Sequence, residues 1–99
     1  MMYPVVVKEE AQQDILDAYI YYEDQQIDLG ERFLKYVYET LNRVAENPQY
    51  YSFLEADIES TFRRIQVPHF PFIVIYEINE DSIVVYEVHN HHKKPRKKV

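Results

Sequence analysis

The hydrophobic pattern of this chain changes its period near Asn47-Pro48, and that change limits the fold more than any other feature. From about Lys8 to Asn47-Pro48, apolar residues recur every three to four positions, which is the spacing of amphipathic helices. From about residue 60 onward they gather in short β-branched and aromatic runs that are typical of strands. Separate helical and strand regions indicate an α+β fold, with the helices packed on one side of a sheet.

The helical region divides into two segments. The first begins at about Lys8 and ends near Gln25, and the second follows Asp28-Leu29-Gly30 and stops at Asn47-Pro48. The short polar break between them implies an antiparallel helical hairpin. We assign the tyrosines on the two apolar stripes to the core: Tyr19, Tyr22 and Tyr38.

Four strands are predicted. The run Tyr3–Val7 is suited to an edge strand, because Pro4 lacks a backbone donor. Residues 49–60 show no period and are expected to form a loop. The later strands are Ser60–Val67, Phe72–Ile78 and Ser82–His89. The predicted order is therefore β-α-α-β-β-β, in a single domain of residues 1–99 whose helical hairpin packs on a small, mostly antiparallel sheet.

The register of the last hairpin decides which polar groups meet. If the turn at Asn79–Ser82 holds two or four residues, Ile78 faces Ile83 and Phe72 faces His89. Phe72, Tyr76, Glu87 and His89 then share one face, whereas an odd-length loop would break the grouping. Both faces are rich in apolar residues, so we expect a second protein chain, as in a homodimer, to cover the side away from the helices.

Charge is distributed unevenly along the chain. Residues 1–92 hold all 17 acidic residues but six of the 11 basic ones, which leaves a net charge of −11. The C-terminal tail, residues 93–99, carries the other five cations: Lys93, Lys94, Arg96, Lys97 and Lys98. An acidic body repels phosphate backbones, so any nucleic-acid contact would be local to this tail and sensitive to salt. A tail that only aids solubility remains the alternative.

Several classes of protein are excluded by composition. With no cysteine, the chain has no disulfide, thiolate zinc site or cysteine nucleophile. No apolar run approaches the length of a membrane span, and the first residues lack the features of a secretory signal. We expect a soluble cytoplasmic protein that does not associate with membranes.

A set of short motifs resembles one known family across nearly the whole chain. The motifs are Leu29-Gly30-Glu31-Arg32-Phe33, Glu46-Asn47-Pro48, Arg63-Arg64, Phe70-Pro71-Phe72 with Tyr76 downstream, and a His-rich segment before Pro95. In this order they resemble the RelE/ParE superfamily of toxins from type II toxin–antitoxin systems, which includes plasmid stabilisation proteins. The resemblance implies a cognate antitoxin whose helix or strand covers the groove between the sheet and the helical hairpin. Superfamily members include ribosome-dependent mRNA endonucleases, gyrase poisons and proteins without demonstrated toxicity.

A nuclease of this kind would need a base, a cation and an acid around the scissile phosphate. The resemblance assigns Arg64 to the phosphate, His89 or His91 to acid–base chemistry, and Glu87 to orienting an imidazole or acting as the base. Ordinary surface pairing of the same side chains is the alternative. Histidines 89, 91 and 92 lack a clear further ligand, so we expect neither a metal nor a cofactor.

Two departures from the superfamily favour the gyrase-directed type. The middle of the chain lacks the lysine-rich surface that holds RNA, and Glu77 and Glu87 add negative charge near the expected site. Many superfamily members have a histidine five residues before the terminal proline, whereas His89 precedes Pro95 by six residues. We therefore expect a ParE-like toxin that acts through protein contacts, with RelE-like mRNA cleavage on the ribosome or a non-toxic binding module as alternatives. Expected target-binding residues are Arg63, Tyr86, His92, Lys93, Lys94, Arg96, Lys97 and Lys98, and Tyr50 and Tyr51 are further candidates for a partner surface.

Overall fold

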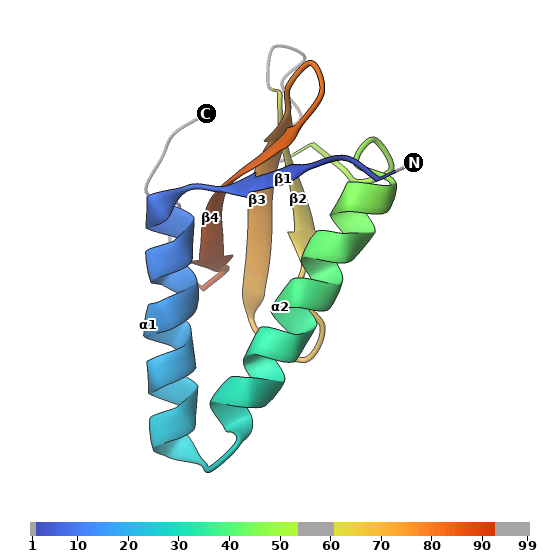
Figure 1. Cartoon of the computed structure of the whole chain (residues 1–99). Helices are drawn as coiled ribbons and strands as arrows, with labels where there is room; N and C mark the ends of the chain where they lie inside the picture. The colour runs from blue at the N-terminus through green and yellow to red at the C-terminus, as the bar shows by residue number, and fades with distance from the viewer. Residues whose placement is uncertain (1, 54–60, 93–99) are drawn as a thin grey trace.

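The computed structural model of the chain describes residues 2–53 and 61–92. Its elements follow the predicted order β-α-α-β-β-β, which is confirmed (Figure 1). Their bounds are β1 Val5–Val7, α1 Glu9–Gln25, α2 Leu29–Glu46, β2 Phe62–Gln66, β3 Phe72–Ile78 and β4 Ile83–Asn90.

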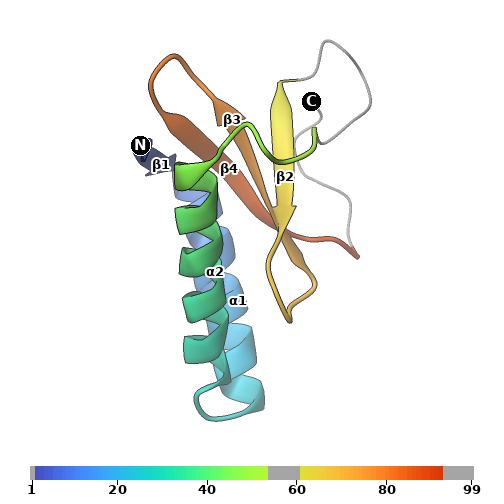
Figure 2. The same cartoon turned by 90° about the vertical axis from the view of Figure 1, so that its right-hand side faces the viewer.

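The four strands form one sheet in the order β1-β4-β3-β2. The β2–β3 and β3–β4 pairs are antiparallel, and β1 pairs with β4 in parallel, so the expected mostly antiparallel sheet with an N-terminal edge strand is confirmed. Figure 2 shows both helices on the same face of this sheet. That face is called the helix face below, and the opposite one the outer face.

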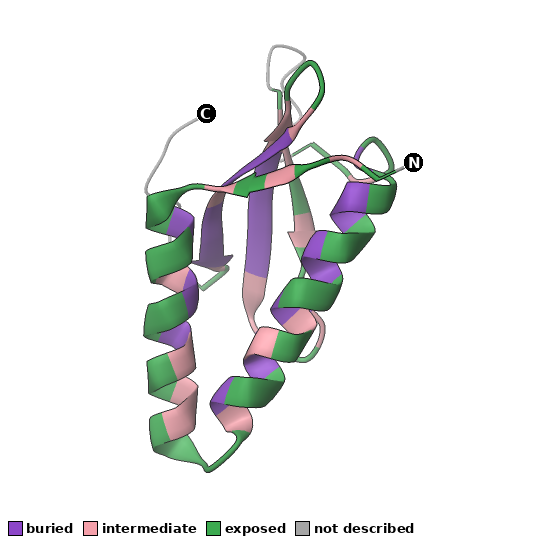
Figure 3. Ribbon diagram, viewed as in Figure 1, coloured by how far each residue is buried: buried purple, intermediate pink, exposed green. Residues whose placement is uncertain are grey.

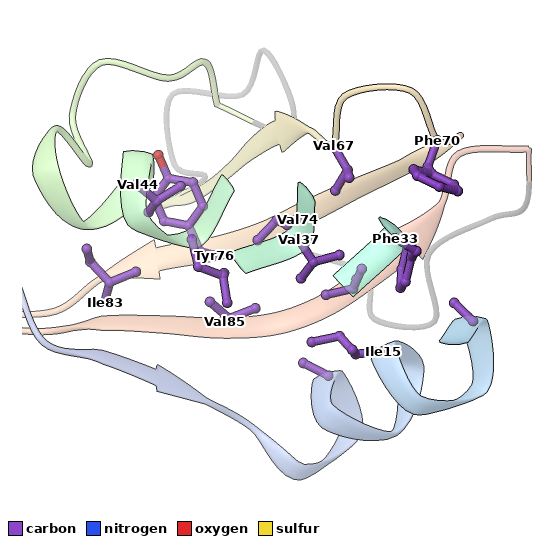
Figure 4. Packing of buried hydrophobic residues seen from close by; sticks show 14 residues of the cluster. Ile15, Phe33, Val37, Val44, Val67, Phe70, Val74, Tyr76, Ile83 and Val85 are labelled. Atoms are coloured by element: carbon purple, nitrogen blue, oxygen red, sulfur yellow. The ribbon is translucent and has the colours of Figure 1, made fainter. Parts of the chain in front are cut away.

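The core lies between the helices and the helix face. Each helix turns one apolar stripe inward and leaves its opposite side exposed (Figure 3). The apolar side chains labelled in Figure 4 come from α1, α2, β3, β4 and the turn between β2 and β3. Buried cluster members are Ala11, Ile15, Ala18, Phe33, Val37, Leu41, Val44, Val67, Phe70, Val74, Tyr76, Ile83, Val85 and Val88.

The junction between the helices explains why a glycine follows Leu29. A Cβ atom on Gly30 would lie 2.7 Å from the carbonyl oxygen of Tyr19. The Glu23 carboxylate accepts hydrogen bonds from the backbone N–H groups of Asp28 and Gly30, each at 3.0 Å. Asp28 itself adopts a left-handed conformation with φ of 71°. The two helices can therefore approach closely only where a side chain is absent.

The last hairpin departs from the predicted register. Its turn holds four residues and Ile78 pairs with Ile83 as expected, but the register shifts between Ile75 and Tyr76. Tyr76 pairs with Val85 and Ile75 with Glu87, so that Tyr86 is an extra residue in β4, a β-bulge. The predicted pairing of Phe72 with His89 is wrong, because the bulge places Phe72 opposite Asn90.

The bulge also corrects the predicted grouping of four side chains on one face. Phe72 and Tyr76 pack with the core cluster on the helix face. Glu87 and His89 pair with Ile75 and Ile73, which are buried but do not belong to that cluster. Because residues opposite one another on paired strands share a face, Glu87 and His89 belong to the outer face.

Two further expectations concern burial. Tyr38 is 54% exposed, so its assignment to the core is wrong, whereas Tyr22 packs partly buried against the core cluster. On the outer face, Ile73 and Ile75 are 8% and 2% exposed within the single chain. A second chain over this face stays a prediction, and the burial of these two side chains does not require it.

Candidate functional site

The outer face carries polar side chains in two rows that run across the sheet. Arg64 on β2 pairs with Ile75 on β3, which pairs with Glu87 on β4. In the next row Gln66 pairs with Ile73, which pairs with His89. Neighbouring strands lie about 4.8 Å apart, so the Arg64 and Glu87 backbones are separated by roughly 10 Å. Three predicted catalytic residues, Arg64, Glu87 and His89, therefore share one face.

Accessibility differs sharply within this set. Glu87 is 2% exposed and His89 is 9% exposed, whereas the Arg64 side chain is exposed. The carboxylate and the imidazole are thus covered within the single chain. Of the three side chains the guanidinium is the most open, and Glu87 and His89 reach the surface only slightly, where they line a groove beside α1.

His91 joins Arg64 in a separate pocket beside β2. His91 and Arg64 line it together with Gln66, Ile73 and a segment after α2, Tyr50–Ser52. The backbone N–H of Arg64 donates to Ser52 O at 3.0 Å, which holds this segment along the edge of β2. Tyr50 is 81% exposed and packs edge-on against Tyr51, with ring centroids 5.1 Å apart. The pocket therefore combines a cation, an imidazole and aromatic rings.

The segment that carries these tyrosines is fixed by Arg63 and Tyr76. Arg63 Nη1 donates to the carbonyl oxygens of Tyr51 at 2.7 Å and Gln49 at 3.3 Å, and its guanidinium lies 4.0 Å from the centre of the Phe53 ring. The buried Tyr76 hydroxyl donates to Pro48 O at 2.7 Å. Burial raises the pKa of Tyr76 to about 12.

These contacts bear on the role expected of Arg63. Its guanidinium is engaged by the chain's own carbonyl groups, and a role in target binding stays a prediction. The positioning role that Arg63 and Tyr76 share was missed from sequence, because neighbouring arginines on a strand look alike until the register is known.

Tyr86 takes its position from the bulge. Its hydroxyl donates to Glu77 Oε1 at 3.0 Å, and its ring packs edge-on against Phe62 with centroids 5.2 Å apart. Burial, together with the hydrogen bond to Glu77, raises the pKa of the Tyr86 phenol. Glu77 also accepts a hydrogen bond from the Thr61 hydroxyl. Tyr86 thus anchors one end of the outer face, and its expected contact with a target stays a prediction.

With this geometry established, comparison with known proteins identifies the family. The model of the family described as "ParE toxin of type II toxin-antitoxin system, parDE" matches residues 5–95. The chain belongs to the ParE toxin family. This agrees with the expected RelE/ParE superfamily membership, which is confirmed.

Several solved structures share this fold. A chain of the chromosomal ParDE system from P. aeruginosa has a TM-score of 0.64 and 16% identity, over 90% of this chain and 96% of that one. The YoeB dimer from Staphylococcus aureus has a TM-score of 0.60 and 12% identity, over 89% of this chain and 95% of that one. A copper-bound mutant toxin from Helicobacter pylori has a TM-score of 0.57 and 16% identity, over 92% and 97%. No curated protein matches by sequence.

A groove lies between α1 and β4 in this ParE-family chain. It is lined by Asp14, Asp17, Ala18, Tyr21, Tyr22, Pro71, Phe72, Glu87, Val88, His89 and Asn90. β1 ends at Val7 opposite Val85, and the Asp14 carboxylate accepts a hydrogen bond from the Val88 N–H at 3.0 Å. The helix carboxylate therefore continues the hydrogen bonding of β4 beyond the end of its neighbouring strand.

The remaining predicted residues of this ParE-family chain lie at the end of β4. His91 and His92 are exposed, and their rings contact each other at a tilt of 48° with centroids 4.6 Å apart. The His92 backbone N–H donates to Asn90 Oδ1 at 2.9 Å. Across residues 2–53 and 61–92, no three His, Asp or Glu side chains form a set that would hold a metal ion. Neither helix in these ranges is long and apolar enough to cross a bilayer. The expected target-binding residues Lys93, Lys94, Arg96, Lys97 and Lys98 lie outside the described residues.

Proposed function

We propose that this ParE-family toxin acts in the cytoplasm by binding a protein target, for which DNA gyrase is the leading candidate, rather than by cutting RNA efficiently. The supporting observation is the burial of the two groups that acid–base chemistry would use. Glu87 and His89 are 2% and 9% exposed. A general base needs to come within about 3 Å of the proton that it removes.

Charge supports the same conclusion. Six basic residues stand against 17 acidic ones in residues 1–92, and among the described residues Arg64 is the only lysine or arginine that lines the pocket beside β2. Proteins that hold RNA depend on phosphate contacts from several lysine and arginine side chains. A protein target can be bound through apolar and polar contacts, so it requires neither a lysine-rich surface nor a set of catalytic residues.

A RelE-like mRNA endonuclease is the second candidate, and the pocket beside β2 favours it. Arg64 would stabilise a phosphate, His91 would move a proton, and Tyr50 and Tyr51 would stack on bases. A binding module of this fold without toxicity is the third candidate, and the buried state of Glu87 and His89 is equally compatible with it.

Inducible expression separates the three candidates. Plasmid supercoiling and protein synthesis are measured in parallel in cells that express the chain, Arg64→Ala, His91→Ala or the control Arg43→Ala, an exposed cation on α2. Protein-target poisoning predicts altered supercoiling and growth arrest that all three variants retain. The proposal fails in favour of mRNA cleavage if the Arg64→Ala and His91→Ala variants are folded but no longer arrest growth, and if mRNA fragments accumulate in cells that express the unchanged chain. Normal growth at high expression of the unchanged chain would support the third candidate, a binding module without toxicity.

We place the cognate antitoxin on the α1–β4 groove and the neighbouring surface of the helical hairpin. Tyr21 is 59% exposed beside this groove, and among the described residues β4 has no paired strand on its β1 side beyond Val85, where an added strand would extend the sheet. Co-expression with the neighbouring gene product, followed by hydrogen exchange of the complex, would test this placement. Slower exchange in α1 and in β4 beyond residue 85 is expected, and protection confined to β2 would contradict it.

A further inference from the structure

The turn between β2 and β3 holds a histidine in an uncommon backbone conformation. His69 has φ of 68°, in the left-handed region that glycine adopts without strain. The Gln66 side-chain amide fixes the turn by donating to three backbone carbonyl oxygens. Its Nε2 lies 2.7 Å from Phe70 O, 3.0 Å from Val67 O and 3.1 Å from Phe72 O. The turn therefore presents an exposed imidazole at a position where the backbone alone would favour glycine.

A pocket lies between this turn and the first two turns of α2, and we call it the turn pocket. Arg32 and Tyr36 line it from α2, and His69 and Phe70 line it from the turn. Phe70 is 8% exposed and packs edge-on against Tyr22, with ring centroids 4.8 Å apart, so this wall is anchored in the core. The cavity volume of about 520 Å³ is within the range of sites that bind small molecules.

The charge of the turn pocket is opposite to that of the rest of the chain. Six basic residues stand against 17 acidic ones in residues 1–92, yet none of the described residues that line this pocket is acidic. Arg32 is exposed and, within residues 2–53 and 61–92, makes no hydrogen bond or ion pair. The adjacent Glu31 accepts a hydrogen bond from the Tyr19 hydroxyl of α1 at 3.2 Å. The Arg32 guanidinium is therefore available to an anion from solution.

Aromatic rings and a second cation stand beside Arg32. The Tyr36 and His69 rings contact each other at a tilt of 58°, with centroids 4.8 Å apart. Lys35 Nζ lies 5.8 Å from the centre of the Tyr36 ring. A guanidinium binds phosphate through two parallel hydrogen bonds, and aromatic side chains stack on nucleobases. The pocket thus combines groups that bind phosphate with groups that bind a planar ring.

Charge and size select among anionic ligands. A phosphate monoester carries a charge of about −1.5 to −2 at pH 7, which the two cations Arg32 and Lys35 offset. A nucleoside triphosphate would bring more negative charge than these two side chains balance. A nucleic-acid strand would set further phosphates against the acidic body and be repelled. Inorganic phosphate alone would leave the Tyr36 and His69 rings without a contact.

We propose that the turn pocket binds a nucleoside monophosphate, with its phosphate on Arg32 and its base against the Tyr36 and His69 rings. Lys35 adds attraction for the phosphate at the edge of the pocket. The turn pocket shares no lining residue with the pocket beside β2 or with the α1–β4 groove except Tyr22, Phe72's neighbour Pro71 and the core they belong to. The inference goes beyond the proposed function and does not depend on it, since neither toxicity nor a partner protein enters the argument.

NMR titration of the isotope-labelled full chain tests this binding. The probe is AMP, and adenosine and inorganic phosphate are its matched controls. AMP should cause saturable shifts in the backbone amides of residues 32–36 and 67–72, and each control should bind at least fivefold more weakly. Affinity for AMP should fall at least threefold between about 50 and 300 mM salt, because the phosphate contacts are exposed. Equal affinity for AMP and either control, shifts confined to other residues, or no saturable shift would overturn the proposal.

Matched variants assign the two parts of the ligand. Arg32→Gln should weaken AMP binding at least fivefold and leave adenosine binding unchanged, because it removes the phosphate contact. His69→Gly should weaken AMP and adenosine binding and leave phosphate binding unchanged, and glycine keeps the turn because it tolerates a φ of 68°. Arg43→Gln removes an exposed cation of α2 outside the pocket and should change AMP affinity less than twofold.

The variants also give results that would contradict the assignment. Equal weakening of AMP binding by Arg32→Gln and Arg43→Gln would show a general effect of charge and overturn the site. Unchanged AMP affinity in His69→Gly would overturn the contact between the base and the imidazole. Circular dichroism of each variant confirms that the chain remains folded, so loss of binding is read only from folded protein.

Discussion

Replacement of Gly30 by alanine tests the close approach of the two helices. The added Cβ would lie 2.7 Å from Tyr19 O and 2.8 Å and 2.9 Å from the Cδ1 and Cε1 atoms of the Tyr19 ring. The shortest of these distances is about 0.7 Å below the 3.4 Å at which ordinary contact begins. The Tyr19 ring has some freedom to move, but its backbone oxygen is fixed within α1, so α2 has to shift outward.

Opposing effects set the magnitude of this change. Overpacking costs about 1–3 kcal/mol, and alanine gains up to about 1 kcal/mol over glycine in a helix. A shift of α2 would also strain the hydrogen bond from the Gly30 N–H to Glu23. The expected net loss in free energy of unfolding is about 1–2 kcal/mol, equivalent to a decrease in Tm of roughly 5–15 °C for a chain of this size.

Thermal and urea unfolding followed by far-UV circular dichroism would measure this loss. Asn42→Ala, at an exposed position of the same helix, serves as the control for helix propensity and should unfold within about 0.5 kcal/mol of the unchanged chain. A Gly30→Ala variant that unfolds at the same temperature or higher would refute the assignment of this glycine to helix packing. A Tm decrease matched by Asn42→Ala would do the same.

Other predictions concern single contacts. Tyr76→Phe leaves the buried Pro48 carbonyl without its donor and should lower the free energy of unfolding by about 1–2 kcal/mol at pH 7. The pKa of Tyr76 is raised to about 12, so the stability that its protonated phenol contributes is complete below about pH 10 and is lost as pH rises through 12. Between pH 9 and 11 the free energy of unfolding, measured by urea titration, should therefore decrease less in Tyr76→Phe than in the unchanged chain. His69 has φ of 68°, so His69→Val should lower the free energy of unfolding by about 1–2 kcal/mol, whereas His69→Gly should not lower it; a loss of equal size in both would contradict a backbone origin. Asp14→Ala should speed hydrogen exchange of the Val88 amide about tenfold, as read by NMR, and Asp17→Ala should leave that rate unchanged.

Most of the fold could be predicted because hydrophobic period, prolines and turn residues agreed along the chain. The helical stripes, the Asn47-Pro48 stop and the four-residue turn before Ile83 each carried a local signal. The assignment of Tyr38 to the core was wrong because a helix in a hairpin has apolar residues both on the side that packs on the sheet and on the exposed side between the two helices. Hydrophobic periodicity does not distinguish these two sides.

The candidate site was predictable only in part. The shared face of Arg64, Glu87 and His89 follows from pairing through Ile73 and Ile75 on the intervening strand. No glycine or proline marks the bulge at Tyr86, so the sequence alone predicted that Phe72 and Tyr76 share a face with Glu87 and His89. Burial of Glu87 and His89 is a tertiary property, and strand periodicity carries no information about it.

The extra residue at position 86 sets the orientation of everything that follows it in β4. If one residue were deleted there, Glu87 and His89 would turn toward the helices and Val88 would turn outward, so that a carboxylate and an imidazole would displace an aliphatic side chain from the interior. Insertions and deletions at this point therefore exchange chemistry between two surfaces without altering any side chain. Where a related toxin lacks this extra residue, counting residues back from its C-terminal end would compare side chains on opposite faces of the sheet.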